Sequence, residues 1–441
     1  MTDSKEKTNR LLSLILKNSF FKKIHGDIKS IPRRGIKNVS YLAMGNFVSQ
    51  FINIVGFIYV ARMLGPKNYG IYVTVSVFVE WFELLLLDGL NTTVLREGSK
   101  DLVRMHIQLE KSIGLRNALI LAAITVCITA SFFTPYQLQT KLYILLFSFQ
   151  IIYNGIKGFF GAIYQATEKM KYISILQITN RLLFVGLSIF FLSLGFGLTA
   201  VFLISLFSNF FTLFLNFRFS RKLIRFNLFA KIHVDKNLLK PAVIFSLMSF
   251  LGYFSTRVDL LMISLLGTPS DVGIYGVAFS IAQQGMILRN LTGAAFFPIF
   301  IKRFHRGKME GRRLIRVSLL FLVGIFAAAF LASLFVEDLV PMVFGAEYQA
   351  SAHVLSVLIF YVAFGCAGMP FSMAAQATHN EKYLLIIISI MAVLNVVLNY
   401  VFFLKFGLIG IAYSTLVVFF VAALLVYLII YRVMKLQGHL V

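Results

Sequence analysis

The octapeptide QATEKMKY at residues 165–172 recurs 211 positions later as QATHNEKY at residues 376–383. The segment LGPKNYGIY at 64–72 returns, one residue longer, as LGTPSDVGIY at 266–275, and Phe196-Gly197-Leu198 returns as Phe406-Gly407-Leu408. These pairs keep their order along the chain, so its two halves resemble each other. In membrane proteins such repeats are typical of transporters in which two related bundles flank a central substrate path.

The composition is that of an integral membrane protein. Hydrophobic residues make up 59% of the chain and charged residues only 14%, whereas soluble domains carry roughly 25% charge. Apolar runs long enough to cross about 30 Å of hydrocarbon as helices recur throughout the chain. We count twelve such runs, at residues 38–63, 71–95, 112–133, 141–165, 172–194, 197–219, 239–266, 272–300, 313–336, 350–376, 383–404 and 407–432.

The net charge of +24 follows the predicted topology. With the N-terminus in the cytoplasm, the expected inner tails and turns hold 34 Lys and Arg, whereas the expected outer turns hold three, Lys67, Lys141 and Lys405. This is the positive-inside asymmetry. We therefore expect a multi-pass protein of the bacterial cytoplasmic membrane with both termini inside, whose basic excess contacts membrane lipid and not nucleic acid.

Six spans in each half give both halves the same direction of entry into the membrane. The sequence thus predicts an all-α integral membrane fold of twelve transmembrane helices, in two six-helix bundles related by a pseudo-twofold axis along the membrane normal. The expected organisation is a basic cytoplasmic tail with a possible interfacial helix, an N-terminal bundle, a basic linker, a C-terminal bundle and a short tail, at residues 1–36, 37–220, 221–238, 239–434 and 435–441.

Two stretches resemble a known family. The segment ARMLGPKNYG at 61–70, joining the first two predicted spans, resembles the signature turn of bacterial polysaccharide (O-antigen-type or capsule-type) flippases. Arg257-Val258-Asp259, followed by LG at 266–267 and VGIY at 272–275, resembles the corresponding turn of the second half. The resemblance covers about residues 36–435. It implies a member of the multidrug/oligosaccharidyl-lipid/polysaccharide exporter superfamily that moves a polyprenyl-diphosphate-linked oligosaccharide from the inner to the outer leaflet.

Ionisable residues within spans are costly, so they tend to face a cavity or a partner. The predicted mid-span cations are Arg257, Arg289, Arg181 and Lys157, and the acids are Glu80, Glu83, Asp88 and Asp259. Fixed cations suit a doubly negative diphosphate, and a planar guanidinium can bind two of its oxygens at once. Alternatively, cations and acids form buried salt bridges between helices. The acids could also carry protons or bind sodium and so couple transport to an ion gradient.

Helical spacing places neutral polar residues on the same faces as these charges. Asn46, Gln50 and Asn53 form a polar stripe on the first span, and Asn154 shares a face with Lys157 on the fourth. Several helices thus turn a polar face toward some interior space. We expect one shared cavity.

Competing functions remain open at this point. The chain has no Gly-Lys-Ser/Thr phosphate loop, no HExxH and no CxxC, and the outer turns are short, so a sugar polymerase or acyltransferase is disfavoured and no cofactor or metal is expected. A multidrug or cation antiporter would favour acids over cations in its cavity. A peptidoglycan-precursor flippase also carries a diphosphate-linked lipid and would favour the same cations. Expected partners are the lipid-linked glycan, together with a polysaccharide polymerase and glycosyltransferases.

Overall fold

The computed structural model describes residues 33–228, 230–232, 236–304 and 311–436. Within these ranges every regular element is a helix, and ten helices are long and apolar enough to cross a membrane. The expected helical membrane fold is therefore confirmed. The possible interfacial helix in the first 32 residues lies outside the described residues.

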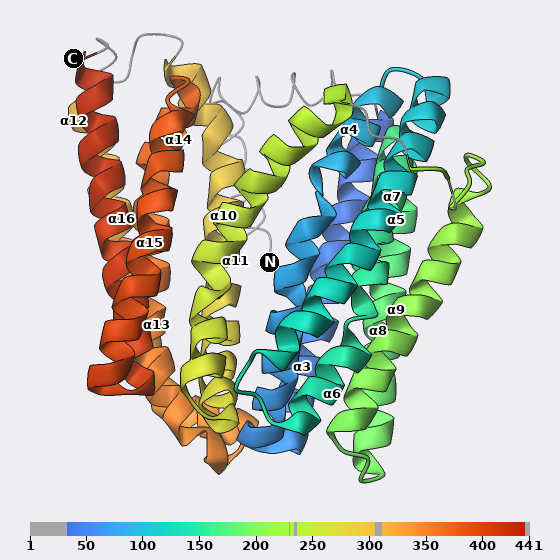
Figure 1. The fold of residues 1–441 in the computed structure, drawn as a ribbon. Coiled ribbons are helices and arrows are strands. Elements are labelled where there is room, and N and C mark those ends of the chain that lie inside the picture. The colour runs from blue at the N-terminus through green and yellow to red at the C-terminus, as the bar shows by residue number, and fades with distance from the viewer. Residues whose placement is uncertain (1–32, 229, 233–235, 305–310, 437–441) are drawn as a thin grey trace, which may run out of the picture.

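Two groups of helices stand beside each other (Figure 1). The first half contains α3 (Arg33–Glu83), η1 (Leu84–Leu86), α4 (Gly89–Gly98), α5 (Leu102–Phe132), α6 (Leu138–Phe147), α7 (Gln150–Ala166), α8 (Lys171–Ser193) and α9 (Leu198–Ser220). The second half contains α10 (Lys236–Leu266), α11 (Pro269–Phe304), α12 (Gly311–Phe344), η2 (Ala346–Tyr348), α13 (Gln349–Ala367), α14 (Met369–Ala377), α15 (Glu381–Phe406) and α16 (Leu408–Leu436). Helix α3 packs along both α8 and α11 and so joins the two groups.

The first two predicted spans meet at a sharp kink inside α3. Gly65 has φ 67° and ψ 170°, a conformation that a residue with a Cβ rarely adopts, and Pro66 follows it. The loop expected between these spans is therefore a kink in one long element. We call this end of the molecule the Gly65 end and the opposite end the α4 end.

Two spans that were expected to be continuous are broken. The run 71–95 ends as α3 at Glu83, passes through η1 and a left-handed Leu87, and resumes as α4. The run 141–165 divides at Ser148 and Phe149 between α6 and α7. The apolar pattern continues across both breaks, so hydropathy alone does not reveal them.

At the Gly65 end the two repeated segments touch through their glycines. A Cβ on Gly70 would overlap the carbonyl oxygen of Pro269 and lie 2.9 Å from the nitrogen of Gly273. A Cβ on Gly273 would in turn overlap the carbonyl oxygen of Pro66 and lie 3.1 Å from the nitrogen of Gly70. We call this reciprocal approach the glycine contact. It lets the backbones of α3 and α11 meet directly.

Helix α10 contacts both halves, and Figure 1 shows it leaning from α4 toward α11. Near its start, Ser246 accepts a hydrogen bond from the Gly89 N–H of α4 at 3.1 Å, and the Ala242 backbone lies against Gly89. Farther along, Asp259 is bonded to α11, α15 and α16. Each end of α10 is therefore fastened to a different half.

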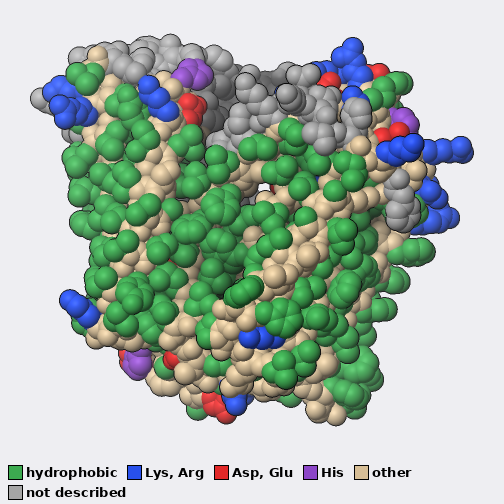
Figure 2. Space-filling model, in the orientation of Figure 1, with side chains coloured by type: hydrophobic (Ala, Val, Ile, Leu, Met, Phe, Trp, Pro, Cys, Tyr) green, Lys and Arg blue, Asp and Glu red, His purple; other side chains and the backbone are tan. Residues whose placement is uncertain are grey.

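The surface has an apolar band between more polar ends (Figure 2). Lys and Arg side chains gather mainly around the α4 end in this view. Large exposed apolar side chains lie on α3, α5, α6, α8, α9, α10, α12, α15 and α16, as expected for helices that face lipid.

Candidate functional site

A cavity of about 340 Å³ lies between the two halves. Its lining comes from six helices, namely α3, α7, α8 and α9 of the first half and α10 and α11 of the second, with Phe147 of α6 added. The cavity begins with Tyr69, directly beside the glycine contact, and extends along three turns of α3 to Glu80. The glycine contact therefore lies at the end of the cavity nearest the Gly65 end.

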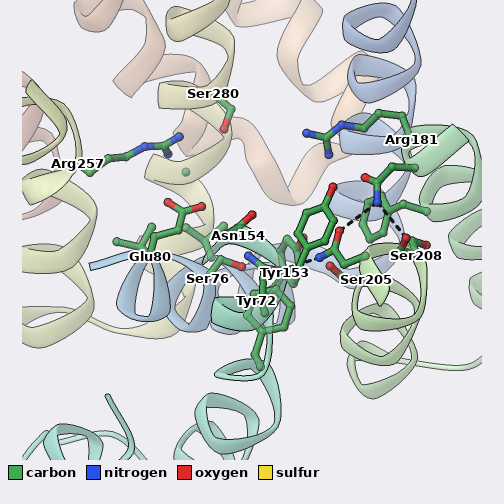
Figure 3. Close-up of a pocket in the computed structure, with 18 of the residues that line it drawn as sticks. Tyr72, Ser76, Glu80, Tyr153, Asn154, Arg181, Ser205, Ser208, Arg257 and Ser280 are labelled. Carbon is green, nitrogen blue, oxygen red and sulfur yellow. Dashed lines mark hydrogen bonds between the residues drawn. The ribbon is translucent and has the colours of Figure 1, made fainter. Parts of the chain in front are cut away.

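Three of the four predicted cations line this cavity: Arg181 from α8, Arg257 from α10 and Lys157 from α7. The guanidinium groups of Arg181 and Arg257 point into it from opposite sides (Figure 3). Arg257 also lies over the ring of Phe279 at 5.8 Å, and Lys157 over that of Tyr153 at 5.3 Å. Arg289 lies in α11, and its side chain is outside the described part of the chain.

Glu80 is the one acid among the lining residues. Its carboxylate accepts a 2.5 Å hydrogen bond from the hydroxyl of Tyr253 on α10. Glu83, one turn farther, accepts a 2.6 Å hydrogen bond from the amide of Asn154. Both acids thus accept hydrogen bonds from neutral side chains. The lining carries an excess of positive charge, which favours binding of an anionic ligand.

Asp88 lies outside the cavity, at the break between η1 and α4, where its side chain is 64% exposed. It forms an ion pair at 3.3 Å with Arg116 of α5, near the start of the predicted run 112–133. Arg116 is fully buried, stacks on the ring of Phe159, and donates to the carbonyl oxygens of Gly155 and Leu87. Asp88 thus pairs with a cation outside the predicted set, and Arg116 stabilises the break in the helix.

Asp259 also lies outside the cavity, sealed among α11, α15 and α16. Its carboxylate accepts hydrogen bonds from Asn399 at 2.8 Å, Thr415 at 2.8 Å and Tyr275 at 3.0 Å. All three donors are uncharged. Nearby, the side-chain oxygens of Asn395 and Asn399 are buried without a hydrogen-bond partner among the described residues.

The polar stripe predicted on the first span does not reach the cavity. Asn46 is exposed, and neither Asn53 nor Gln50 belongs to the lining. Gln50 instead donates a 2.5 Å hydrogen bond to Gln284 of α11, across the boundary between the halves. Of the four predicted polar lining residues, Asn154 alone lies at the cavity.

Much of the lining was not predicted. It includes neutral side chains on α3, α7, α8, α9 and α11, namely Tyr69, Tyr72, Ser76, Gln150, Tyr153, Asn180, Ser205, Ser208, Asn209 and Ser280. One signal was present in the sequence: Ser205, Ser208, Asn209, Thr212 and Asn216 have the i, i+3, i+4, i+7, i+11 spacing of one helical face on the Phe-rich helix α9. These residues are uncharged, so they stand out less within an apolar run than the ionisable residues do.

Comparison with known proteins identifies the family of this chain. The family described as polysaccharide biosynthesis protein matches residues 36–304. The chain belongs to this family. Among its relatives, the capsular polysaccharide biosynthesis protein CapF of Staphylococcus aureus is 23% identical over 411 residues, covering 89% of this chain and 98% of CapF. The probable low-salt glycan biosynthesis flippase Agl15 of Haloferax volcanii is 25% identical, but that match spans 40% of this chain and 37% of Agl15.

Solved structures support the same fold for this polysaccharide biosynthesis protein. A multidrug resistance MATE family transporter in an inward-facing conformation superposes with a TM-score of 0.69 at 16% identity, covering 91% of this chain and 98% of the transporter. The lipid II flippase MurJ, in an inward closed conformation, also gives 0.69, at 14% identity and with 87% and 86% of the two chains covered. The resemblance to a polysaccharide flippase is thereby confirmed at the level of family and fold.

Proposed function

We propose that this protein moves a polyprenyl-diphosphate-linked oligosaccharide from the inner to the outer leaflet of a bacterial cytoplasmic membrane. The observation that carries the proposal is the pairing of Arg181 and Arg257, one from each half, across a single cavity. A diphosphate would be held there by charge-assisted hydrogen bonds while the lipid tail stays in the bilayer. Fixed cations would lower the cost of carrying the charged headgroup across the hydrocarbon.

Alternating access would follow from rocking of two six-helix bundles, spanning 37–220 and 239–434 on either side of the linker 221–238. The ten candidate spans become twelve when α3 is divided at Gly65 and α11 is added. The basic α4 end would then face the cytoplasm together with both termini. A polysaccharide polymerase and glycosyltransferases are the proposed partners.

Two related functions are the alternatives, and the cavity disfavours one of them. A multidrug or cation antiporter would need acids in its cavity, yet three cations and only Glu80 line this one. A peptidoglycan-precursor flippase would use the same cations, so it differs in cargo and not in mechanism. The choice between these cargoes is therefore made by identifying the glycan.

Mass spectrometry of polyprenyl-diphosphate-linked glycans, in cells with and without this protein, tests the function. We expect a finished repeat unit to accumulate on its lipid in the inner leaflet when the protein is removed. A muropeptide-bearing lipid would instead identify the peptidoglycan precursor as cargo. An unchanged pool of lipid-linked glycans would contradict the proposal.

Among the predicted acids, we propose Asp259 as the one that couples transport to an ion gradient. Its three hydrogen-bond donors are neutral, and the side-chain oxygens of Asn395 and Asn399, which have no partner within the described ranges, lie close by. Rotation of an Asn side chain can present its oxygen instead of its N–H groups, so these amides could join Asp259 around a cation. A proton on the carboxylate would satisfy the same site.

Replacing Asp259 with asparagine is expected to remove ion-driven transport while leaving the fold intact, because the amide keeps the shape of the side chain but not its charge. The measurement is transport of lipid-linked glycan in vesicles, with a sodium gradient at constant pH or a pH gradient at constant sodium. Glu337→Gln, an exposed acid outside the cavity, is the control. Equal gradient dependence in the wild type and Asp259→Asn would overturn the assignment.

A further inference from the structure

The cavity has two chemically different surfaces. Arg181 and Arg257 bring positive charge to it, whereas uncharged side chains of α7, α8 and α9 form much of the rest (Figure 3). We call this second surface the amide wall and define it as Gln150, Asn180, Ser205, Ser208 and Asn209. The cations would be sufficient to bind a diphosphate. The amide wall is therefore expected to bind a different chemical group of the cargo.

Hydrogen bonds within the amide wall fix how its members face the cavity. The amide nitrogen of Asn180 lies 3.1 Å from Asn209 Oδ1 and 3.1 Å from the carbonyl oxygen of Ser208. The amide nitrogen of Asn209 in turn donates to Gln150 Oε1 at 3.3 Å. This chain of bonds occupies the nitrogen of Asn180, the oxygen of Gln150 and both ends of Asn209, and so orients the remaining groups of Asn180 and Gln150.

The same bonds leave capacity for a ligand. Gln150 uses its oxygen within the wall, which leaves its N–H groups to donate, and Asn180 uses its nitrogen, which leaves its oxygen to accept. The hydroxyl of Ser208 is buried and has no hydrogen-bond partner in the part of the chain that the structure describes. Such groups favour a ligand that both donates and accepts hydrogen bonds, because a buried polar group without a hydrogen bond is energetically costly.

Sugars meet this requirement. Their hydroxyl and N-acetyl groups donate and accept hydrogen bonds, and their C–H faces can pack on aromatic rings such as Tyr72, Tyr153 and Phe184, which also line the cavity. A volume of about 340 Å³ is at the small end for ligand pockets. It has room for a diphosphate and the sugar beside it, not for a long glycan.

We propose that the amide wall selects the cargo by its first sugar, the one attached to the diphosphate, while Arg181 and Arg257 hold the diphosphate itself. The proposal rests on the proposed flippase function. It divides recognition into a charged part shared by all lipid-linked cargoes and a neutral part specific to the sugar. Ser208, Gln150 and Asn180 thereby become determinants of specificity, and Asn209 orients the two amides.

The test uses two probes from one source. The first is the lipid-linked glycan purified from cells that lack this protein, and the second is the polyprenyl diphosphate left after mild acid removes its glycan. Binding of both is measured with purified full-length protein in detergent micelles. For Ser208→Ala and Gln150→Met we expect about tenfold weaker binding of the glycosylated lipid, since each loses one hydrogen bond to the sugar, and unchanged binding of bare polyprenyl diphosphate.

Ser208→Ala should not disturb folding, because its hydroxyl has no hydrogen-bond partner among the residues that the structure describes. Asn216→Ala is the matched control: it removes a buried amide on the same stripe of α9, outside the cavity. Equal losses for both probes, or no loss for either, would overturn the role of the amide wall. If the wild type binds neither lipid, the flippase function itself fails.

Discussion

Replacing Arg257 with glutamine is expected to slow transport of the lipid-linked glycan by about 10- to 100-fold, since one charge-assisted hydrogen bond contributes about 1.5–3 kcal/mol and each 1.4 kcal/mol is tenfold. The neutral amide keeps much of the length of the side chain but neither its charge nor its paired N–H groups. Arg181→Gln should have a similar effect, because its guanidinium faces the same space from the other side. Arg257→Lys should retain part of the activity.

The measurement is the level of inner-leaflet lipid-linked glycan and of finished polysaccharide, at equal protein abundance. Arg62→Gln serves as control, because Arg62 is exposed at the Gly65 end and donates to the carbonyl oxygen of Val343, away from the cavity. Normal output from both Arg181→Gln and Arg257→Gln would show that the cavity cations do not carry the headgroup.

Adding a methyl group at the glycine contact should also stop transport. In Gly70→Ala and Gly273→Ala the new Cβ would overlap backbone of the opposite segment, which cannot rotate away as a side chain can. Overpacking of this kind costs about 1–3 kcal/mol, and that cost falls only on the conformation in which the Gly65 end is closed. The equilibrium should therefore shift toward an outward-open molecule.

Thiol labelling can follow this shift. A cysteine at Ser280, which lines the cavity, should react faster with a membrane-impermeant reagent added outside when Gly70→Ala is also present. The native Cys127 and Cys366 are buried and give little background. Gly186→Ala is the control, because a Cβ there would meet nothing within 4 Å. Unchanged labelling and normal transport in Gly70→Ala would exclude the glycine contact as a gate.

The sequence predicted features that depend on local pattern. Apolar runs located the helices, and the rule that charges within spans seek a cavity selected Arg181, Arg257 and Lys157, all of which line one. Spacing along one helix was enough to select Asn154 as well. Each of these predictions uses only residues that are close together in the chain.

Features that depend on partners far apart in the chain were missed. Asp259 accepts hydrogen bonds from Asn399 and Thr415, which lie 140 and 156 positions away. No residue near Asp259 in the sequence indicates these partners. Arg116 looks like an ordinary basic residue at a helix end until the backbone turns at Leu87 and offers it a carbonyl oxygen. Such contacts arise from how helices pack, which apolar periodicity does not specify.

The attachment of α10 to both halves has a mechanical consequence. Because Ser246 is bound to α4 while Asp259 is bound to α15 and α16, rotation of one half against the other must deform the stretch between them or break one attachment. Within that stretch, Gly252 has open space around it and offers a place to bend. Arg257 lies beyond it on the same stretch, so the deformation would carry this cation along. Motion of the protein and release of the headgroup would then be one event.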